Sequence, residues 1–146
     1  SHAHSAPLHD INSYIKQKYN TVVLAKELQD QRNIYHFILK NNRAAGFSKI
    51  ILNEPHPDVA HPRVSKLQRL YLLSEFYGFN LGMELFNYNL HLSKISNAAG
   101  MWLFVWKENH RALAFYKKIG FKIIGSVDFR ISETHSNPNH LMFLEY

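Results

Sequence analysis

The sequence YLLSEFYGFNLG, residues 71–82, passes from an apolar run through a turn with a glycine to the start of a helical pattern. Backbone N–H groups at the start of a helix have no acceptor within the helix, and the helix dipole adds partial positive charge there. Such a turn therefore favours an anion. The stretch predicts a strand, an anion-binding turn and a helix, in that order.

Apolar spacing extends this unit on both sides. Lys66–Leu73 has strand character, and Met101–Trp106 is apolar at every position, as a strand covered on both faces is. Between them runs the 3.6-residue period of an amphipathic helix, with Leu81, Leu85, Tyr88, Leu92, Ile95 and Ala99 on its inner face. A strand, a crossover helix and a second strand predict a parallel strand pair.

The residues before this unit predict two short helices and a hairpin. Ile11 and Ile15 are four residues apart, as are Leu24 and Leu28 after a possible cap at Asn20. Strands Ile34–Leu39 and Gly46–Leu52 flank a polar turn at Lys40–Arg43, and three prolines make Asn53–Pro62 a loop.

The residues after Trp106 predict a helix and two closing strands. Asn109 is suited to cap a helix that ends at Gly120, with Ala112, Phe115, Tyr116 and Ile119 inside. Strands Phe121–Ile131 and His140–Tyr146 follow, joined by a loop that contains Pro138. The expected fold is one α/β domain over residues 1–146: a mixed, mostly antiparallel sheet with helices on both faces.

Composition excludes several classes of protein. Zero cysteines remove disulfides, thiolate zinc sites and cysteine nucleophiles, and favour a cytoplasmic protein. No apolar run approaches the ~18 residues of a membrane span. The charge, 17 − 11 = +6, predicts an anionic partner such as a nucleic acid, a membrane or a phosphorylated cofactor. Because the basic residues are scattered, a nucleic-acid groove is ranked last.

Two motifs together resemble the GNAT family of acyl-CoA-dependent N-acetyltransferases. They are the turn at residues 77–82 and the pattern Asn109-x-x-Ala112-x-x-Phe115-Tyr116-x-x-x-Gly120-Phe121. The helical pair and Trp102-x-x-Val105-Trp106 are most similar to the PaiA-type polyamine acetyltransferases. The resemblance implies a twisted sheet with a splayed central parallel pair, and acetyl transfer from acetyl-CoA to a primary amine, with no metal. A polyamine is one candidate acceptor, and a non-catalytic CoA-binding protein is the alternative.

The resemblance also assigns site residues. Tyr116 matches the tyrosine that protonates the departing thiolate, and a phenol of pKa ~10 suits a thiol of pKa ~8.5. The pantetheine arm of CoA is expected along Leu70, Tyr71 and Leu72, with help from Asn109. The pyrophosphate is expected on the turn formed by Tyr77, Gly78, Phe79, Asn80, Leu81, Gly82 and Met83.

The turn departs from the family pattern at two places. Tyr77 stands where the family has Gln or Arg, and Asn80 stands where it has Gly. Asparagine enters the left-handed region more easily than other non-glycine residues, so the turn is still expected to form. Since residues 70–93 contain no Lys or Arg, charge for the phosphates must come from elsewhere, with Lys107, Arg111, Lys117 and Lys118 as candidates.

No general base is assigned. Relatives often carry a glutamate where this chain has Lys66, Leu67 and Gln68. The remaining candidates are Glu54, Asp58, Glu75, His56, His61 and water. The spacing of His56-Pro57-Asp58 and His61 matches no metal chelate, and His2-x-His4 is typical of a frayed end.

The start of the chain also departs from the family. The resemblance implies a first strand and helix that are missing here, which would leave Ile34–Leu39 at the edge of the sheet. We expect a second copy of the chain, as in a homodimer, or another segment to cover that edge.

Overall fold

The computed structural model describes residues 30–130 and 132–146, and the two helices predicted before Ile34 lie outside this part. Its six strands form one sheet in the order β1-β2-β3-β4-β6-β5. The strands are β1 (Asn33–Lys40), β2 (Arg43–Ile51), β3 (Ser65–Leu72), β4 (Gly100–Trp106), β5 (Lys122–Arg130) and β6 (Ser136–Glu145). The helices are η2 (Ser74–Phe76), α3 (Leu81–Ile95) and α4 (His110–Ile119).

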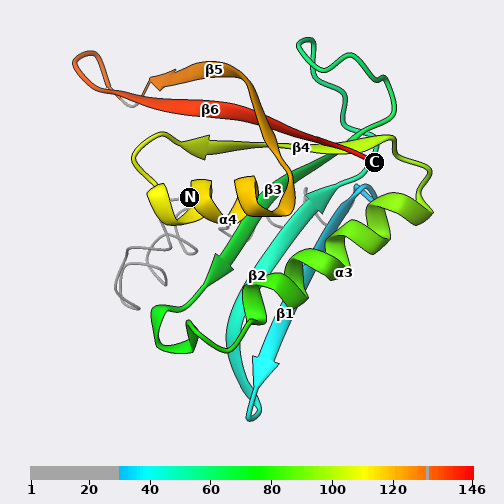
Figure 1. Ribbon diagram of the computed structural model, residues 1–146, viewed down its shortest axis with the longest axis vertical. Helices are drawn as coiled ribbons and strands as arrows, with labels where there is room; N and C mark the ends of the chain where they lie inside the picture. Colours follow the sequence, from blue (N-terminus) through cyan, green and yellow to red (C-terminus); the bar gives the residue numbers. More distant parts are fainter. Residues whose placement is uncertain (1–29, 131) are drawn as a thin grey trace.

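The central strands β3 and β4 are parallel and separate after a short contact. Their pairing is limited to two residue pairs, Ser65 with Met101 and Lys66 with Trp102. Figure 1 shows the two strands starting together near the C-terminus and diverging towards α4. All other neighbouring strands are antiparallel. The predicted mixed sheet with a splayed central parallel pair is confirmed.

The first hairpin is tighter than predicted. Asn41 and Asn42 have φ values of 52° and 63°, so two residues suffice to reverse the chain. Pairing therefore continues to the turn, and β2 begins at Arg43 rather than at Gly46. Among the described strands β1 lies at the sheet edge, and its cover by a second copy stays a prediction.

The last strand begins earlier than predicted. Pro138 lies within β6, opposite Asp128 of β5, and not in a loop. The register of β6 with β4 ends at Asn139, and on that side Pro138 takes part only through its carbonyl, which accepts from the backbone N–H of Lys107 at 3.0 Å. Proline is tolerated at such a position because a central ladder does not depend on its missing N–H.

The inner face of α3 differs from the predicted one. Tyr88 is 46% exposed and Ile95 is 63% exposed, and Ala99 lies beyond the end of the helix. The buried residues are instead Leu81, Leu85, Phe86, Asn89 and Ser93.

Two polar residues explain this rotation. The Asn89 side chain donates to Ser48 Oγ and to the Leu85 carbonyl, both at 2.8 Å. Ser93 Oγ donates to Ser65 Oγ at 2.9 Å. These bonds satisfy the Asn89 amide nitrogen and the Ser93 hydroxyl, although Asn89 Oδ1 is buried with no partner among the described residues. The bonded groups allow a face that contains them to pack on the sheet. An apolar pattern alone misses it.

The helices α3 and α4 pack on one face of the sheet. Leu85 and Phe86 of α3 join Ala112, Leu113 and Tyr116 of α4 in a single core cluster. The opposite face carries a separate cluster in which loop residues Val59 and Val64 cover Trp102 and Leu141. The expectation of helices on both faces falls on residues outside the described part. No helix in the described part is long and apolar enough to cross a membrane.

Candidate active site

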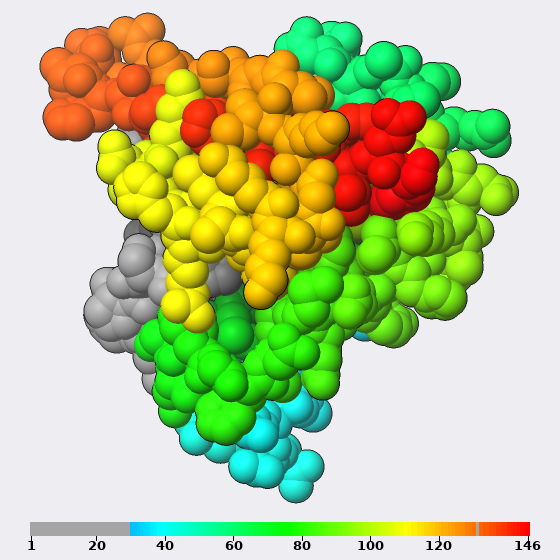
Figure 2. Space-filling view, viewed as in Figure 1, coloured from blue at the N-terminus to red at the C-terminus, as the bar shows by residue number. Residues whose placement is uncertain are grey.

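A cavity of about 360 Å³ opens where β3 leaves β4, on the face that carries both helices. Figure 2 shows it as a hollow between α4 and the turn that leads into α3. Its size is typical of small-molecule sites. The lining residues are Leu70, Tyr71, Leu72, Tyr77, Gly78, Asn80, Leu81, Gly82, Met83, Leu85, Arg111, Ala112, Phe115 and Tyr116.

The turn before α3 has the geometry that the sequence predicts. Gly78 has φ 89°, and Asn80 has φ 61° and ψ 19°, so asparagine does occupy the left-handed region. The Asn80 side chain makes no cap hydrogen bond, and the first backbone bond of the helix runs from Glu84 N–H to the Asn80 carbonyl. Among the described residues, the N–H groups of Leu81, Gly82 and Met83 therefore have no backbone acceptor.

One edge of β3 faces the cavity. On its other side Leu72 pairs with Gly46 and Leu70 pairs with Ser48 of β2. The two strands approach so closely that a Cβ on Gly46 would lie 2.2 Å from the Tyr71 carbonyl oxygen. Beyond Lys66 no pairing ties β3 to β4, so β4 does not occupy the backbone groups of Leu70 and Leu72 on the cavity side.

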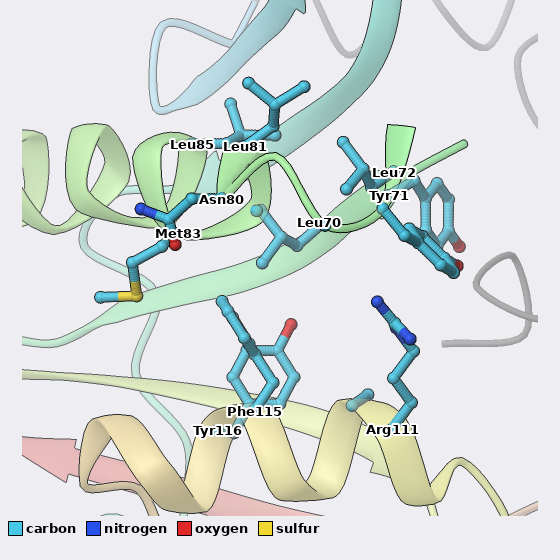
Figure 3. Close-up of a pocket in the computed structure, with 14 residues that line it drawn as sticks. Leu70, Tyr71, Leu72, Asn80, Leu81, Met83, Leu85, Arg111, Phe115 and Tyr116 are labelled. Atoms are coloured by element: carbon cyan, nitrogen blue, oxygen red, sulfur yellow. The ribbon is translucent and has the colours of Figure 1, made fainter. Parts of the chain in front are cut away.

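Tyr116 projects from α4 into the cavity. In Figure 3 its hydroxyl points from the helix towards Leu70 on β3. The ring packs against Phe115 and Phe121, with centroids 5.4 Å away in each case, and the residue is only 6% exposed. Burial raises the pKa of the Tyr116 phenol well above its usual value, so it remains a proton donor at neutral pH.

Arg111 supplies the charge that the turn lacks. Its guanidinium lies 3.7 Å from the centre of the Tyr77 ring, and Figure 3 shows it reaching from α4 across the cavity. Burial raises the pKa of the Tyr77 phenol, and the charge of Arg111 offsets only part of this rise. Arg111 is the one charged side chain that lines the cavity in the described part. The sequence predicts it only as one of four basic candidates. Arg111 stands four residues before Phe115 on α4, and this spacing indicates that the two side chains share one face of the helix.

Three predicted cofactor residues do not line the cavity. Phe79 is 52% exposed, with Lys40 Nζ 4.4 Å from its ring centre. Asn109 is the N-cap of α4, where its side-chain oxygen accepts from Ala112 N–H at 3.2 Å. Lys118 is exposed on α4. The other predicted residues, from Leu70 through Met83, meet at the cavity with Tyr116.

No candidate base lines the cavity either. Glu75 pairs with Arg43 at 3.2 Å, and Glu54 pairs with Arg32 at 3.4 Å. His61 lies 3.4 Å from Glu145. His56 Nδ1 accepts from the backbone N–H of Asp58 at 3.0 Å.

Within residues 30–130 and 132–146, no three His, Asp or Glu side chains gather as metal ligands. His56 lies 4.8 Å from the Trp102 ring, in the cluster on the other face of the sheet. His2 and His4 lie outside the described residues.

Comparison with known proteins gives one consistent result. Residues 5–121 match the model of the acetyltransferase (GNAT) family. The chain is 30% identical over 132 residues to a Mycobacterium tuberculosis protein described as an uncharacterized N-acetyltransferase, covering 90% of this chain and 80% of that protein.

Two solved structures share the fold. The PaiA N-acetyltransferase of Thermoplasma acidophilum, in complex with coenzyme A, has a TM-score of 0.69 at 21% identity, covering 99% of this chain and 83% of that chain. Arabidopsis thaliana Naa50, in complex with the bisubstrate analogue CoA-Ac-MVNAL, has a TM-score of 0.70 at 17% identity, covering 97% and 95% of the two chains.

Proposed function

Since the chain belongs to the acetyltransferase (GNAT) family, we propose that it transfers an acetyl group from acetyl-CoA to a primary amine of a small molecule. The observation that carries the proposal is the cavity at the splay, which joins the edge of β3 that has left β4, an uncapped helix start and a buried tyrosine hydroxyl.

The cavity offers acetyl-CoA a distinct partner for each part. The N–H groups from Gly78 to Met83 and the Arg111 guanidinium suit the pyrophosphate, because both present donors with positive charge. The edge of β3 at Leu70 and Leu72, which does not pair with β4, suits the amide groups of pantetheine, because these can pair with a strand as a peptide does. Phe79 and Lys118 would contact only parts of the cofactor that extend beyond the cavity.

The chemistry follows from direct attack. The nitrogen lone pair of a neutral amine attacks the thioester carbonyl, a C–N bond forms and the C–S bond breaks. Tyr116 donates its phenolic proton to the departing sulfur and is reprotonated from solvent. No carboxylate or histidine lines the cavity in the described part, so the amine loses its proton to water in this scheme.

Thermal unfolding and thiol release test the proposal together. Saturating acetyl-CoA should raise the melting temperature, and a panel of primary amines that includes polyamines should reveal acceptor-dependent release of free CoA. Absence of both signals would overturn the proposal.

A second candidate function is a CoA-binding protein without catalysis. It is favoured by the lack of a carboxylate at the cavity and by Lys66 at a place where relatives often carry glutamate. An acetyl-CoA-dependent shift in melting temperature without thiol release from any amine would support it.

A further inference from the structure

The gap between β3 and β4 beyond the Lys66–Trp102 pair, here called the slot, has a second side. Its helix side is the cavity already described, with Leu70 and Tyr116. Its other side, here called the acceptor side, carries the aromatic residues His56, Trp102 and Phe104. If acetyl-CoA fills the helix side, the acceptor side is the opposite approach to the thioester carbonyl.

One ammonium group already lies on the acceptor side. Lys66 Nζ lies 5.0 Å from the centre of the Trp102 ring and 5.3 Å from that of Phe104. Phe104 lies beyond the last residue of β4 that pairs with β3, so the Lys66 side chain extends along β4 into the mouth of the slot. The aromatic faces that would attract a cationic acceptor are thus occupied by a residue of the chain itself.

No carboxylate neutralises this ammonium within the described part of the chain. Glu54 is close enough to raise the pKa of Lys66, but its own side chain pairs with Arg32. Burial has the larger effect and lowers the pKa of Lys66, because the charged form is poorly solvated there. A half-buried ammonium without a counter-ion is stabilised by an anion and destabilises a second cation.

A second polar group of the same strand has no hydrogen-bond partner within the described residues. Gln68 is the bulge residue of β3, two positions after Lys66, and its buried Oε1 atom accepts no hydrogen bond from the described residues. A carbonyl oxygen accepts from N–H groups, as an amine nucleophile would offer. Lys66 and Gln68 thus contribute a positively charged donor and a carbonyl acceptor from positions two residues apart on β3.

We propose that the acceptor is an amine that carries a carboxylate or phosphate a few bonds from its nitrogen, with the acid paired to Lys66 and the amine near Gln68. This inference rests on the proposed acetyltransferase function and names its acceptor class. It disfavours polyamines, whose second ammonium would face Lys66. An amino acid is the simplest molecule of the proposed class.

Matched acceptor pairs test the inference. Tyrosine and tyramine differ by one carboxylate, as do ornithine and 1,4-diaminobutane. We expect kcat/KM, measured by thiol release, to be about tenfold or more higher for the acid-bearing member of each pair. Lys66→Arg should keep this ratio, Lys66→Gln should bring it near one, and Lys66→Glu should invert it.

Lys94 provides a matched control. Lys94 is an exposed residue of α3, and its Nζ atom lies 5.4 Å from the centre of the Tyr146 ring. Lys94→Glu therefore makes the same charge change beside a different aromatic ring. Its acceptor ratio should equal that of the wild type. Because each ratio is measured within one variant, partial loss of folded protein does not alter it.

The outcomes separate the inference from the proposed function. A wild-type ratio near one, or a Lys66→Glu ratio like that of wild type, would overturn the inference while thiol release still supports the acetyltransferase. If no amine is turned over, binding of tyrosine is measured by calorimetry with CoA present. Tyrosine should bind the wild type and not Lys66→Glu. Failure of tyrosine to bind the wild type would overturn the inference. Absence of any acetyl-CoA effect on the melting temperature would count against the proposed function itself.

Discussion

Helices α3 and α4 both begin at an asparagine, and the two asparagines act in opposite ways. Asn109 caps α4, since its side chain accepts the N–H of Ala112. Asn80 adopts the left-handed conformation, gives no cap and leaves the first N–H groups of α3 facing the cavity. The start of α4 is capped, which stabilises the helix, whereas the start of α3 is left open for a ligand. Residue type at a helix start therefore does not reveal its role, whereas backbone conformation does.

The largest expected effect is a loss of kcat on changing Tyr116 of α4, with acetyl-CoA binding at the start of α3 retained. Tyr116→Phe removes the proton donor while keeping the buried ring, so kcat should fall by about 100-fold. The shift in melting temperature caused by acetyl-CoA should remain, because the open helix end is untouched. A wild-type kcat in this variant would remove Tyr116 from the proposed chemistry.

The next effect concerns the charge that α4 lends to the turn. Arg111→Gln removes the guanidinium that lies against Tyr77, so KM for acetyl-CoA should rise about tenfold with kcat little changed. Arg111→Lys is the control that keeps the charge but not the planar fork. Acetyl-pantetheine, which lacks the pyrophosphate, should be used equally well by wild type and Arg111→Gln. A tenfold loss with acetyl-pantetheine would show that Arg111 acts on something other than phosphate.

The two asparagines can be compared directly by the same substitution. Asn109→Ala removes a cap and should lower the free energy of unfolding by about 1 kcal/mol, with KM for acetyl-CoA unchanged. Asn80→Ala places a less tolerant residue in the left-handed region, at a similar cost of about 1 kcal/mol, and should also raise KM.

Controls for this pair use residues that suit each position. Asn109→Ser keeps a cap and Asn80→Gly keeps the left-handed backbone, so each should restore most of the loss. Denaturant unfolding and initial rates give both quantities. Equal effects of the two alanine variants on KM would break the comparison.

The smallest effect is a pH dependence that the two helices share. His36 lies against Tyr88 of α3, with ring centres 4.2 Å apart, and burial lowers its pKa. Burial lowers the pKa of His140, and so do the charges of Lys107, which follows β4, and of Lys117 on α4. In the unfolded chain both histidines titrate near 6.5, so this stability is present above that pH and declines as the pH falls below it.

Melting temperatures between pH 7.5 and 5 would check this pH dependence. His36→Asn and His140→Asn should each flatten the acid limb of the profile, since asparagine does not titrate in this range. An acid limb unchanged in the double variant would assign the loss to other groups.

Much of the fold could be predicted because its signals are local. The continuous apolar run of β4 and the strand–helix–strand spacing around α3 led to the parallel pair, and Asn80 led to a left-handed turn. The buried face of α3 could not be predicted in this way. It depends on Asn89 and Ser93 meeting serines that are 41 and 28 residues away in the chain.

The candidate site likewise has a part that the sequence predicts locally and a part that depends on contacts between distant elements. The turn and the edge of β3 are contiguous in sequence, so their residues were found together. Arg111 reaches Tyr77 from a separate helix, and Lys66 reaches the rings of another strand. Such pairings depend on how elements cross in space, which a single sequence does not encode locally.

The short contact between β3 and β4 has a mechanical consequence. Strands β1, β2 and β3 form one leaf of the sheet, and β4, β6 and β5 form another, with two residue pairs as the seam between them. Pulling the leaves apart across this seam opposes few backbone hydrogen bonds, so the apolar core beneath α3 and α4 must resist most of the load. A substrate that pairs with the edge of β3 while touching α4 would span both leaves, and would serve as a temporary piece of the sheet.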